Sequence, residues 1–483
     1  MSWREGVVYQ VYPRSFADSD GDGTGDLEGI RRHLDHLQWL GVSALWLSPV
    51  YPSPLADWGY DVCDYTAVDA QLGSLEEFDR LLADAHDRGL RLLMDLVPCH
   101  TSIEHPWFRE HPDWYIWAPG DGPPNNWTSA FGGPAWDRDP ASGRWYLHSF
   151  YPEQPDLDWH NPAVVEAMQG VIRFWMERGV DGFRLDAIDR LVKDPELRDD
   201  PPAAEEFGLP LLNHERGRAL VHSRNAPGTG GALAALREAA GEDAFLVGEV
   251  YLPTARAAPY LEHLDRLFVF ELLHSSWDAE SVRRAVGPAA ALRGRPGAGP
   301  AWVLSNHDFG FLAHRFGREN ERAAAMLLLT LPGTAFVYQG DEIGMGNGPG
   351  ADPPRDRIGR DSFRHPMQWD SARGAGFTTG EPWLPLVDPD VRNVADQRRD
   401  PDSLLSLYRE LIALRRDLPD EFEAADGAPG VVAFRRGERL VVINLSGERR
   451  AVPGGEVVLA TARDALGPDG SLAAHAGVVI APA

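Results

Sequence analysis

The chain has 483 residues, a length that suits one large barrel with smaller units and a sizeable buried core. It carries 46 basic and 73 acidic residues, which gives a formal net charge of −27. This charge repels phosphate backbones and anionic lipids, so neither nucleic acid nor a membrane surface is an expected partner. The opening MSWREGVVYQVYP lacks the basic, apolar and small-residue regions of a secretory signal, which predicts a cytoplasmic protein.

Cysteine content and hydropathy narrow the class further. Only two cysteines occur, Cys63 and Cys99, which excludes a disulfide framework and suits a reducing compartment. Both are expected to be small buried side chains. The longest apolar stretch, AAAMLLLTLPGTAFVYQ, is broken by Pro332 and Gly333. It therefore predicts a buried helix, a turn and a strand, and not a membrane span.

Short runs rich in valine, leucine and isoleucine alternate with amphipathic segments along most of the chain. This alternation is typical of an α/β fold whose parallel strands are joined by crossover helices. In LEEFDRLLADAHDRG, for example, Phe78, Leu81, Leu82 and Ala85 recur at helical spacing. Eight strand candidates predict a (β/α)8 TIM barrel. They are VVYQVY near Val7, SALWLS near Ala44, LRLLMDLV near Arg91, DGFRLD near Phe183, AFLVGE near Phe245, RLFVFE near Leu267, AWVLSN near Trp302 and TAFVYQ near Phe336.

Two insertions and a C-terminal unit accompany the barrel. The gap after the third strand is too long for an ordinary loop and is rich in tryptophan, so it predicts a small inserted domain over 101–165. A second, polar insertion over about 192–241 is expected at the rim of a site. Short alternating runs near the end, GVVAFRRGERLVVINL and GEVVLATA, predict an antiparallel β-sandwich domain over 418–483. The barrel then comprises 1–100 and 166–417.

Three separated strands each deliver a carboxylate at or just after their C-terminal end. In GVDGFRLDAID, Arg184 and Asp186 are two residues apart and so share one face of a strand. A guanidinium beside a carboxylate favours its ionised form, which suits a nucleophile, although a structural ion pair explains the same spacing. AFLVGEVY and AWVLSNHDF place Glu249 and Asp308 at two other strand ends. Since a barrel builds its active site from the carboxyl ends of several strands, these three acids are the predicted catalytic residues.

Four segments, in this order, resemble the motifs of the α-amylase family of glycoside hydrolases. They are DLVPCH from Asp95 to His100, GFRLDAI from Gly182 to Ile188, VGEV around Glu249 and SNHD ending at Asp308. QPDLDW, from Gln154, resembles the QPDLN signature of the oligo-1,6-glucosidase subfamily, which also contains α-glucosidases, trehalose-processing enzymes and sucrose isomerases. The resemblance runs over nearly the whole chain.

The resemblance implies a role for each predicted acid. Asp186 would be the nucleophile, Glu249 the general acid/base, and Asp308 the carboxylate that stabilises the transition state and distorts the sugar. A retaining glycosidase needs one ionised and one protonated carboxyl about 5–5.5 Å apart. We expect Arg184 to keep Asp186 charged, and we expect Glu249, which has no obvious charged partner, to keep a raised pKa.

Further residues are implied to bind the substrate, a small oligosaccharide. His100 and His307 match the family histidines that hydrogen-bond hydroxyls of the sugar at the cleavage point, and Tyr60 resembles the tyrosine that stacks under that sugar. Asp61 matches the residue that binds hydroxyls at the non-reducing end. Its expected arginine partner is Arg360 in GRDSFRHPMQW, a segment that resembles GRDxxRTPMQW of the subfamily. A pair of this kind closes the pocket and implies an exo-acting enzyme.

Two single residues refine what is expected of the bond specificity and of the metal content. Ala187 follows the predicted nucleophile, where the subfamily tends to have valine with α-1,6 specificity and smaller or hydroxylated residues with α-1,4 specificity, so it favours α-1,4 bonds. Cys99 stands where the family usually has asparagine. Because a thiol is a much weaker hydrogen-bonding group, the interdomain metal site of classical amylases is not expected here.

A different metal site is predicted in the loop DSDGDGTGD. Closely spaced oxygen ligands on a glycine-rich turn suit Ca²⁺ or Mg²⁺. Gly29 stands where an EF-hand has its bidentate glutamate, but the subfamily that the chain resembles has a calcium loop here. The expected cation is structural, and no organic cofactor is expected. The predicted ligands are Asp18, Asp20, Asp22, Thr24 and Asp26.

The leading functional hypothesis is a retaining, exo-acting α-glucosidase that cleaves terminal α-1,4-linked glucose from short oligosaccharides and also transglycosylates. A second hypothesis keeps the same acids but transfers glucose within one molecule, as trehalose synthases and sucrose isomerases do. A third is a non-catalytic scaffold, like the transporter heavy chains that resemble this subfamily. It is disfavoured because those chains typically carry a membrane span and have lost catalytic residues.

Overall fold

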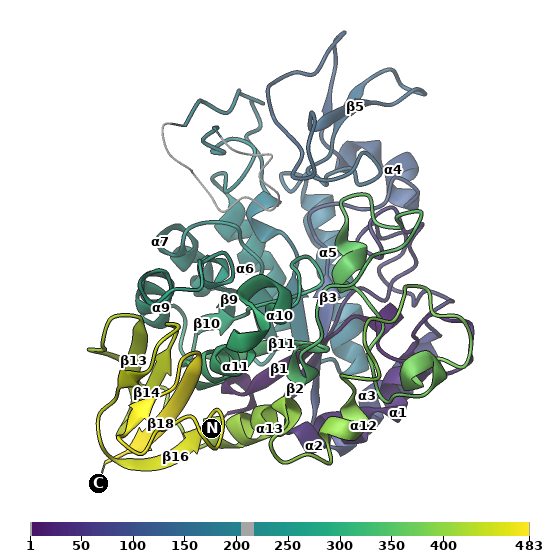
Figure 1. Ribbon diagram of the computed structural model, residues 1–483. Helices are drawn as coiled ribbons and strands as arrows, with labels where there is room; N and C mark the ends of the chain where they lie inside the picture. Colours follow the sequence, from purple (N-terminus) through teal and green to yellow (C-terminus); the bar gives the residue numbers. More distant parts are fainter. Residues whose placement is uncertain (1, 204–216, 483) are drawn as a thin grey trace.

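The computed structural model describes residues 2–203 and 217–482, and its centre is a closed barrel of eight parallel strands (Figure 1). Their order around the barrel is β1-β11-β10-β9-β8-β7-β3-β2. All eight predicted strands are present, so the predicted barrel is confirmed. The strands are β1 Val7–Val11, β2 Ala44–Leu47, β3 Arg91–Leu96, β7 Gly182–Leu185, β8 Phe245–Gly248, β9 Arg266–Phe268, β10 Gly299–Trp302 and β11 Thr334–Tyr338.

The strands are buried on both faces, which explains their nearly continuous apolar sequences. In β1, Val8 belongs to the cluster that also contains Trp46, Leu93 and Phe336 from other barrel strands. Its neighbour Tyr9 belongs to the separate, larger cluster that includes the surrounding helices. Alternate side chains therefore fill the barrel interior and the layer between barrel and helices.

Helices between the strands cover the outside of the barrel. Ser74 caps the helix that begins at Leu75 by accepting a hydrogen bond from the Glu77 N–H, and all four apolar residues predicted for this helix are buried. The predicted helix, turn and strand near Pro332 are also present. Among the described residues, no helix is both long and apolar enough to cross a bilayer. The helices are α1 Leu27–Arg32, α2 Leu34–Leu40, α3 Leu75–Asp87, α5 Pro162–Arg178, α6 Thr229–Ala240, α7 Thr254–Ala257, α8 Phe270–Leu273, α9 Ala279–Ala290, α10 Leu312–Phe316, α11 Glu321–Thr330, α12 Val394–Gln397 and α13 Leu404–Arg415.

The insertion after β3 forms a small unit of its own, at the top of Figure 1. Trp127 and Trp136 stack with ring centroids 6.1 Å apart and belong to a separate apolar cluster. Helix α5, capped by Asn161, begins at Pro162 and so lies partly inside the range predicted for the insertion. Part of the predicted second insertion, residues 204–216, lies outside the described residues. The elements of the first insertion are α4 Pro106–Glu110, β4 Trp117–Ala118, β5 Trp136–Arg138 and β6 Trp145–Leu147.

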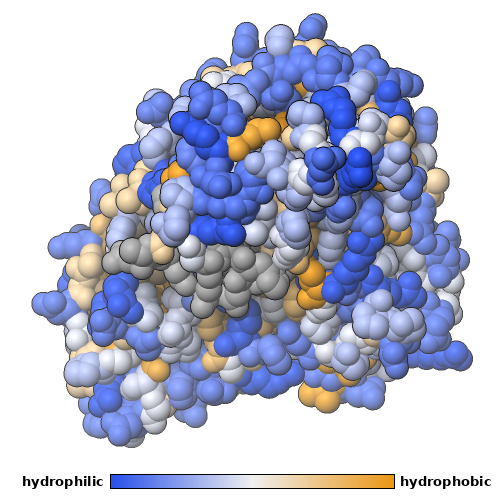
Figure 2. Space-filling view, turned by 90° about the horizontal axis from the view of Figure 1, so that it is seen from above, coloured by the Kyte–Doolittle hydropathy of each residue, from blue (hydrophilic) through white to orange (hydrophobic). Residues whose placement is uncertain are grey.

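The C-terminal region forms a five-stranded antiparallel sheet in the order β12-β13-β14-β18-β16, next to a two-stranded sheet of β15 and β17. Strands β14 and β18 pack against α11, away from the inserted unit (Figure 1). Seen from above, the surface is mostly hydrophilic, with apolar residues in small separate patches (Figure 2). The strands are β12 Glu423–Ala425, β13 Val431–Arg436, β14 Arg439–Asn444, β15 Arg450–Ala451, β16 Glu456–Ala460, β17 Ser471–Leu472 and β18 Ala476–Ala481.

Candidate active site

The centre of the candidate site is Arg184, near the end of β7, whose guanidinium contacts three buried carboxylates. Its Nη1 lies 2.9 Å from Oδ1 of Asp95 and 2.5 Å from Oδ1 of Asp186. Its Nη2 lies 2.7 Å from Oε1 of Glu249. Asp95 belongs to β3, and Glu249 follows β8, so the three acids come from neighbouring strands of the barrel. One guanidinium group therefore contacts all three carboxylates.

Burial is the largest influence on the acids around Arg184. It raises the pKa of Glu249 to about 8, with Asp186 and Asp308 adding to the rise and Arg184 opposing it. Burial also raises the pKa of Asp186, which Arg184 and a hydrogen bond with Glu249 lower in turn. The expectation of a raised pKa for Glu249 is confirmed. Arg184 is a charged partner of Glu249 as well as of Asp186. Contrary to expectation, it does not hold the pKa of Asp186 low, because burial outweighs its charge and the pKa of Asp186 is raised.

Asp308, after β10, has a different environment. Its Oδ1 accepts hydrogen bonds from Nη1 of Arg360 at 2.8 Å and Nη2 of Arg364 at 3.2 Å, and its Oδ2 lies 3.2 Å from Nε2 of His307. Burial raises the pKa of Asp308, but His307 and the two arginines outweigh it, so the pKa is well below its usual range. Asp308 is thus held as a carboxylate.

Tyr60 and the two predicted histidines surround the same acids. The Tyr60 ring stacks on the His307 ring, with centroids 5.1 Å apart and planes at 3°, and its hydroxyl donates to Oδ2 of Asp95 at 3.0 Å. Burial lowers the pKa of His100 to about 4, so its imidazole is neutral at neutral pH. The buried Nδ1 of His100 has no hydrogen-bond partner among the described residues, which leaves it available to a ligand hydroxyl.

Arg360 pairs with Asp57 and not, as predicted, with Asp61. Nη2 of Arg360 donates to Oδ1 of Asp57. Asp61 instead accepts from Oγ of Ser53 at 2.7 Å and from the N–H groups of Ala56 at 2.8 Å and Asp57 at 3.0 Å. Asp61 therefore holds the turn that presents Asp57, and its carboxylate is engaged by that turn.

Backbone geometry explains this exchange of roles. Trp58 and Gly59 both have positive φ, 51° and 111°, so the chain reverses between Asp57 and Tyr60. As a result Asp57 and Tyr60 line the same pocket, while Asp61 lies beneath the turn. The sequence signal was an acid three residues before Tyr60, but the turn type was needed to choose between the two acids.

Residues from many loops line one narrow pocket at the carboxyl ends of the strands. All three predicted catalytic acids belong to it, together with predicted binding residues and others that the sequence analysis missed. Ala187 has a positive φ of 45°, which directs its N–H to Oε2 of Glu249 at 3.1 Å. The lining residues are Asp57, Tyr60, His100, Phe131, Phe150, Asp186, Ala187, Arg190, Glu249, Tyr251, Asp308 and Arg360.

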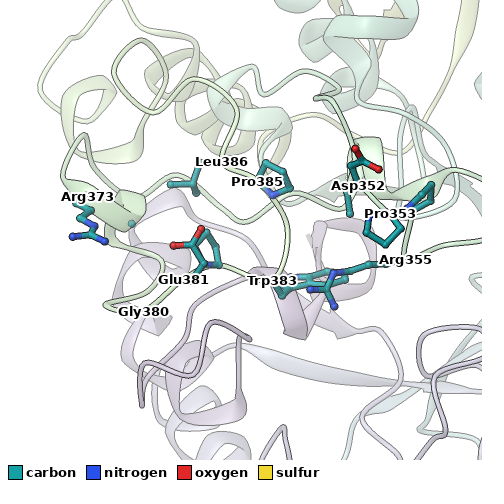
Figure 3. A pocket seen from close by; sticks show the side chains of 13 residues that line it. Asp352, Pro353, Arg355, Arg373, Gly380, Glu381, Trp383, Pro385 and Leu386 are labelled. Atoms are coloured by element: carbon teal, nitrogen blue, oxygen red, sulfur yellow. The ribbon is translucent and has the colours of Figure 1, made fainter.

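A larger cavity of about 780 Å³ lies elsewhere, on the segment between Ala351 and Leu386 (Figure 3). Arg355 and Trp383 lie together on one side of it, with the guanidinium carbon 6.0 Å from the ring centroid. Glu381 and Arg373 lie on the other side. None of the three predicted catalytic acids lines this cavity, so the narrow pocket is the candidate active site although it is smaller.

The predicted metal loop brings three of its acids together. Asp18, Asp20 and Asp22 each offer a carboxylate oxygen within 4.8 Å of the others. Asp20 and Asp22 each accept one N–H of the turn and are otherwise exposed, which suits a hard cation, whereas Asp18 already accepts from three N–H groups of the loop and from the Thr378 hydroxyl. Asp26 lies outside this group, because it caps α1 by accepting from the Gly29 N–H at 2.6 Å and also accepts from the Ser19 N–H at 2.7 Å. The N–H of Thr24 is the turn donor to Asp22, at 2.7 Å.

The two cysteines differ in their surroundings. Cys63 is partly exposed, contrary to expectation, whereas Cys99 is buried as predicted. The Cys99 thiol donates to the Arg190 carbonyl at 3.4 Å and lies 3.8 Å from Nζ of Lys193, which pairs with Asp156 at 2.8 Å. Cys99, His100 and Asp156 offer ligand atoms within 4.8 Å of one another, and the ammonium group of Lys193 already pairs with the Asp156 carboxylate in this group.

Comparisons with known proteins agree with this geometry. The family model described as the catalytic domain of alpha amylase matches residues 10–421. A probable alpha-glucosidase of Rhizobium meliloti (strain 1021) is 40% identical over 90% of this chain and 87% of that protein. An oligo-1,6-glucosidase of Parageobacillus thermoglucosidasius is 37% identical over 86% of this chain and 83% of that protein.

Solved structures extend the similarity to the whole chain. The alpha-glucosyl transfer enzyme XgtA superposes with a TM-score of 0.91 at 36% identity, covering 100% of this chain and 99% of that one. The trehalulose synthase MutB of Pseudomonas mesoacidophila MX-45 superposes with a TM-score of 0.88 at 31% identity, covering 99% of both chains.

Proposed function

Because this chain belongs to the α-amylase family of glycoside hydrolases, we propose that it is a retaining, exo-acting α-glucosidase that removes terminal glucose from short oligosaccharides. The observation that carries the proposal is the contact of Arg184 with both Asp186 and Glu249. These two acids line one narrow pocket together with the ionised Asp308. The matching alpha-glucosidases and oligo-1,6-glucosidase support the same activity.

In the first step, Asp186 attacks the anomeric carbon while Glu249 protonates the departing glycosidic oxygen. The raised pKa of Glu249 keeps its proton available at neutral pH. Positive charge develops on the sugar ring, and Asp308, whose pKa is lowered, supplies the negative charge that stabilises it. The product of this step is a glucosyl ester of Asp186 and a free leaving group.

In the second step, Glu249 accepts a proton from water as the water attacks the anomeric carbon and releases Asp186. Two displacements at one carbon return the original α configuration. A sugar hydroxyl that replaces the water gives transglycosylation, because the same base accepts its proton. The small Ala187 beside Asp186 favours α-1,4-linked substrates within this proposal.

The pair of Asp57 and Arg360 supports exo action. Both residues line the pocket, and Arg360 is held further by Asp308 at 2.8 Å and Asp356 at 2.7 Å. A guanidinium that binds three carboxylates has a fixed position. We infer that this wall stops the chain at its non-reducing end, so that one glucose unit enters.

The test incubates the protein with maltotetraose labelled at its reducing end, and with maltose, isomaltose, trehalose and sucrose. We expect labelled maltotriose and glucose as first products, glucose in the α form by NMR before mutarotation, and faster cleavage of maltose than of isomaltose. Labelled maltose as the first product would contradict exo action, and β-glucose would contradict retention.

Intramolecular glucosyl transfer is the second candidate. Phe131 and Phe150 line the narrow pocket, and apolar walls disfavour the entry of water to the glucosyl intermediate. The similarity to an alpha-glucosyl transfer enzyme and a trehalulose synthase supports it. The same incubations distinguish the two, since an isomerase converts sucrose or maltose into a new disaccharide with little free glucose.

We also propose a structural divalent cation, Ca²⁺ or Mg²⁺, at Asp18, Asp20 and Asp22. The acidic loop contacts the segment 377–383, since the Thr378 hydroxyl donates to Asp18 and the Trp383 N–H donates to Gly23. A cation there would neutralise the carboxylates without taking part in the reaction. We further propose that the protein resides in the reducing cytoplasmic compartment, and its two free cysteines support this location.

Removal of the cation is expected to lower the melting temperature by several degrees, because a ligand that binds only the folded state stabilises it. The measurement compares thermal unfolding in EDTA with unfolding after Ca²⁺ or Mg²⁺ is restored in excess. In the control variant Asp22→Asn, the response to either metal should be smaller. An identical melting temperature of the wild type in EDTA and in excess metal would contradict the site.

A further inference from the structure

Tyr251 is a pocket residue to which neither the sequence analysis nor the proposed reaction assigns a role. It follows Glu249 by two residues, is 4% exposed and lines the narrow pocket. Its ring stacks on Phe270, with centroids 4.6 Å apart and planes at 17°. Its hydroxyl donates a hydrogen bond of 3.1 Å to Oε1 of Glu249. The aromatic contact therefore fixes the ring, and the ring aims its hydroxyl at the proposed acid/base.

The two oxygens of Glu249 have unequal surroundings. Oε1 lies 2.7 Å from Nη2 of the cationic Arg184 and accepts a hydrogen bond from the Tyr251 hydroxyl at 3.1 Å. Oε2 accepts from the Ala187 N–H at 3.1 Å. The Tyr251 hydroxyl uses one lone pair of Oε1, and the positive charge of Arg184 beside the same oxygen disfavours a proton there. The proton of the neutral acid therefore belongs on Oε2.

We propose that Tyr251 is a positioning residue for Glu249, an inference that rests on the proposed glycosidase function. Its hydroxyl and Arg184 together confine the acidic proton to Oε2. When that proton moves to the glycosidic oxygen, the bond from that oxygen to the anomeric carbon breaks and Asp186 bonds to the carbon. Tyr251 then stabilises the Glu249 carboxylate that remains, until the attacking water returns a proton.

Several charged groups around Glu249 influence its pKa in addition to Tyr251. Arg184 and Asp186 face it from the end of β7, Asp308 from the loop after β10, and Asp95 from β3. Burial raises the pKa of Tyr251 well above its usual value, so its hydroxyl stays protonated and remains a donor. A donor to the charged form of an acid lowers the pKa of that acid, so removing the Tyr251 hydroxyl should raise the pKa of Glu249.

The variant Tyr251→Phe keeps the stacked ring and removes the hydroxyl. In the pH profile of kcat/KM, we expect the alkaline limb to move upward by about 0.5–1 pH unit, the size expected for one hydrogen bond to a charged group. Because the acid becomes weaker, kcat/KM for maltose should fall several-fold, while 4-nitrophenyl α-glucoside, whose leaving group needs little protonation, should be affected less. The matched control is Tyr146→Phe, which removes a hydroxyl bonded to the Pro152 carbonyl in the inserted unit.

An alkaline limb that stays in place in Tyr251→Phe, as in Tyr146→Phe, would overturn the inference. A wild-type protein that cleaves no α-glucoside would contradict the proposed function instead. In that event, NMR titration of glutamate labelled at the carboxyl carbon, assigned with Glu249→Gln, still decides the role of Tyr251. An upward shift of the Glu249 titration in Tyr251→Phe supports the inference, and an unchanged titration contradicts it.

Discussion

Replacing Asp186 with asparagine is expected to lower kcat on maltose by about four orders of magnitude or more, because the amide cannot form the glucosyl ester. The side chains have nearly the same size, so the variant should fold. Circular dichroism and thermal unfolding check the fold, and glucose release is the measurement. Retention of a tenth of the wild-type rate would contradict the assignment of the nucleophile.

Added azide tests the two roles separately. In Asp186→Gly, azide can enter the space left by the carboxylate and attack a substrate with a good leaving group, such as α-glucosyl fluoride. Attack from that face gives the β-glucosyl azide. In Glu249→Gln, Asp186 still forms the intermediate, and azide then gives the α-glucosyl azide by a second displacement. The opposite pairing of products and variants would reverse the roles proposed for Asp186 and Glu249.

The sequence was sufficient to predict the barrel and the meeting of its acids. Parallel strands present their carboxyl ends at the same edge, so Asp186, Glu249 and Asp308 had to approach each other once the eight strands were identified. The order and type of the strands follow from apolar runs and helical spacing, which are local properties. The ends of the strands also depend on pairing between strands. Strand β10 begins at Gly299, before the predicted segment AWVLSN, because residues 299–301 pair with β9.

Pairings between side chains of different elements could not be predicted. The choice between Asp57 and Asp61 depends on positive φ at Trp58, a conformation that bulky residues rarely adopt. Likewise, Arg184 stands beside Asp186 in the sequence, but its contacts with Asp95 and Glu249 arise only when β3, β7 and β8 lie next to each other. The role of Asp26 as a helix cap competes with metal binding in the same loop.

The sharing of Arg184 leads to the second large expected effect. Replacing Arg184 with methionine leaves Asp95, Asp186 and Glu249 in a buried site without their common cation. Removing one partner from a buried ionic group typically costs about 3–5 kcal/mol, and we expect a loss of this size in the free energy of unfolding at pH 8. Glucose release should also fall to background, because Asp186 and Glu249, the two carboxyls proposed to react, lose the cation that contacts both of them.

The loss of stability should depend on pH in a defined direction. The folded-state pKa values of Asp95, Asp186 and Glu249 are raised by burial already with Arg184 present, whereas in the unfolded chain they are about 4. The folded state therefore binds protons more tightly than the unfolded state, and stability rises as pH falls through this window. Arg184→Met should be much closer to the wild type at pH 5 than at pH 8.

Urea unfolding at pH 5 and pH 8 measures this difference. The control is Arg178→Met, which removes a partly exposed arginine that pairs with Asp79 at 2.7 Å, and it should change stability by less than about 1 kcal/mol at either pH. An equal loss for Arg184→Met at both pH values would mean that packing of the arginine, and not the uncompensated charge of three carboxylates, stabilises the site. A loss confined to high pH would show that the reactive acids are kept together against their own repulsion by one guanidinium.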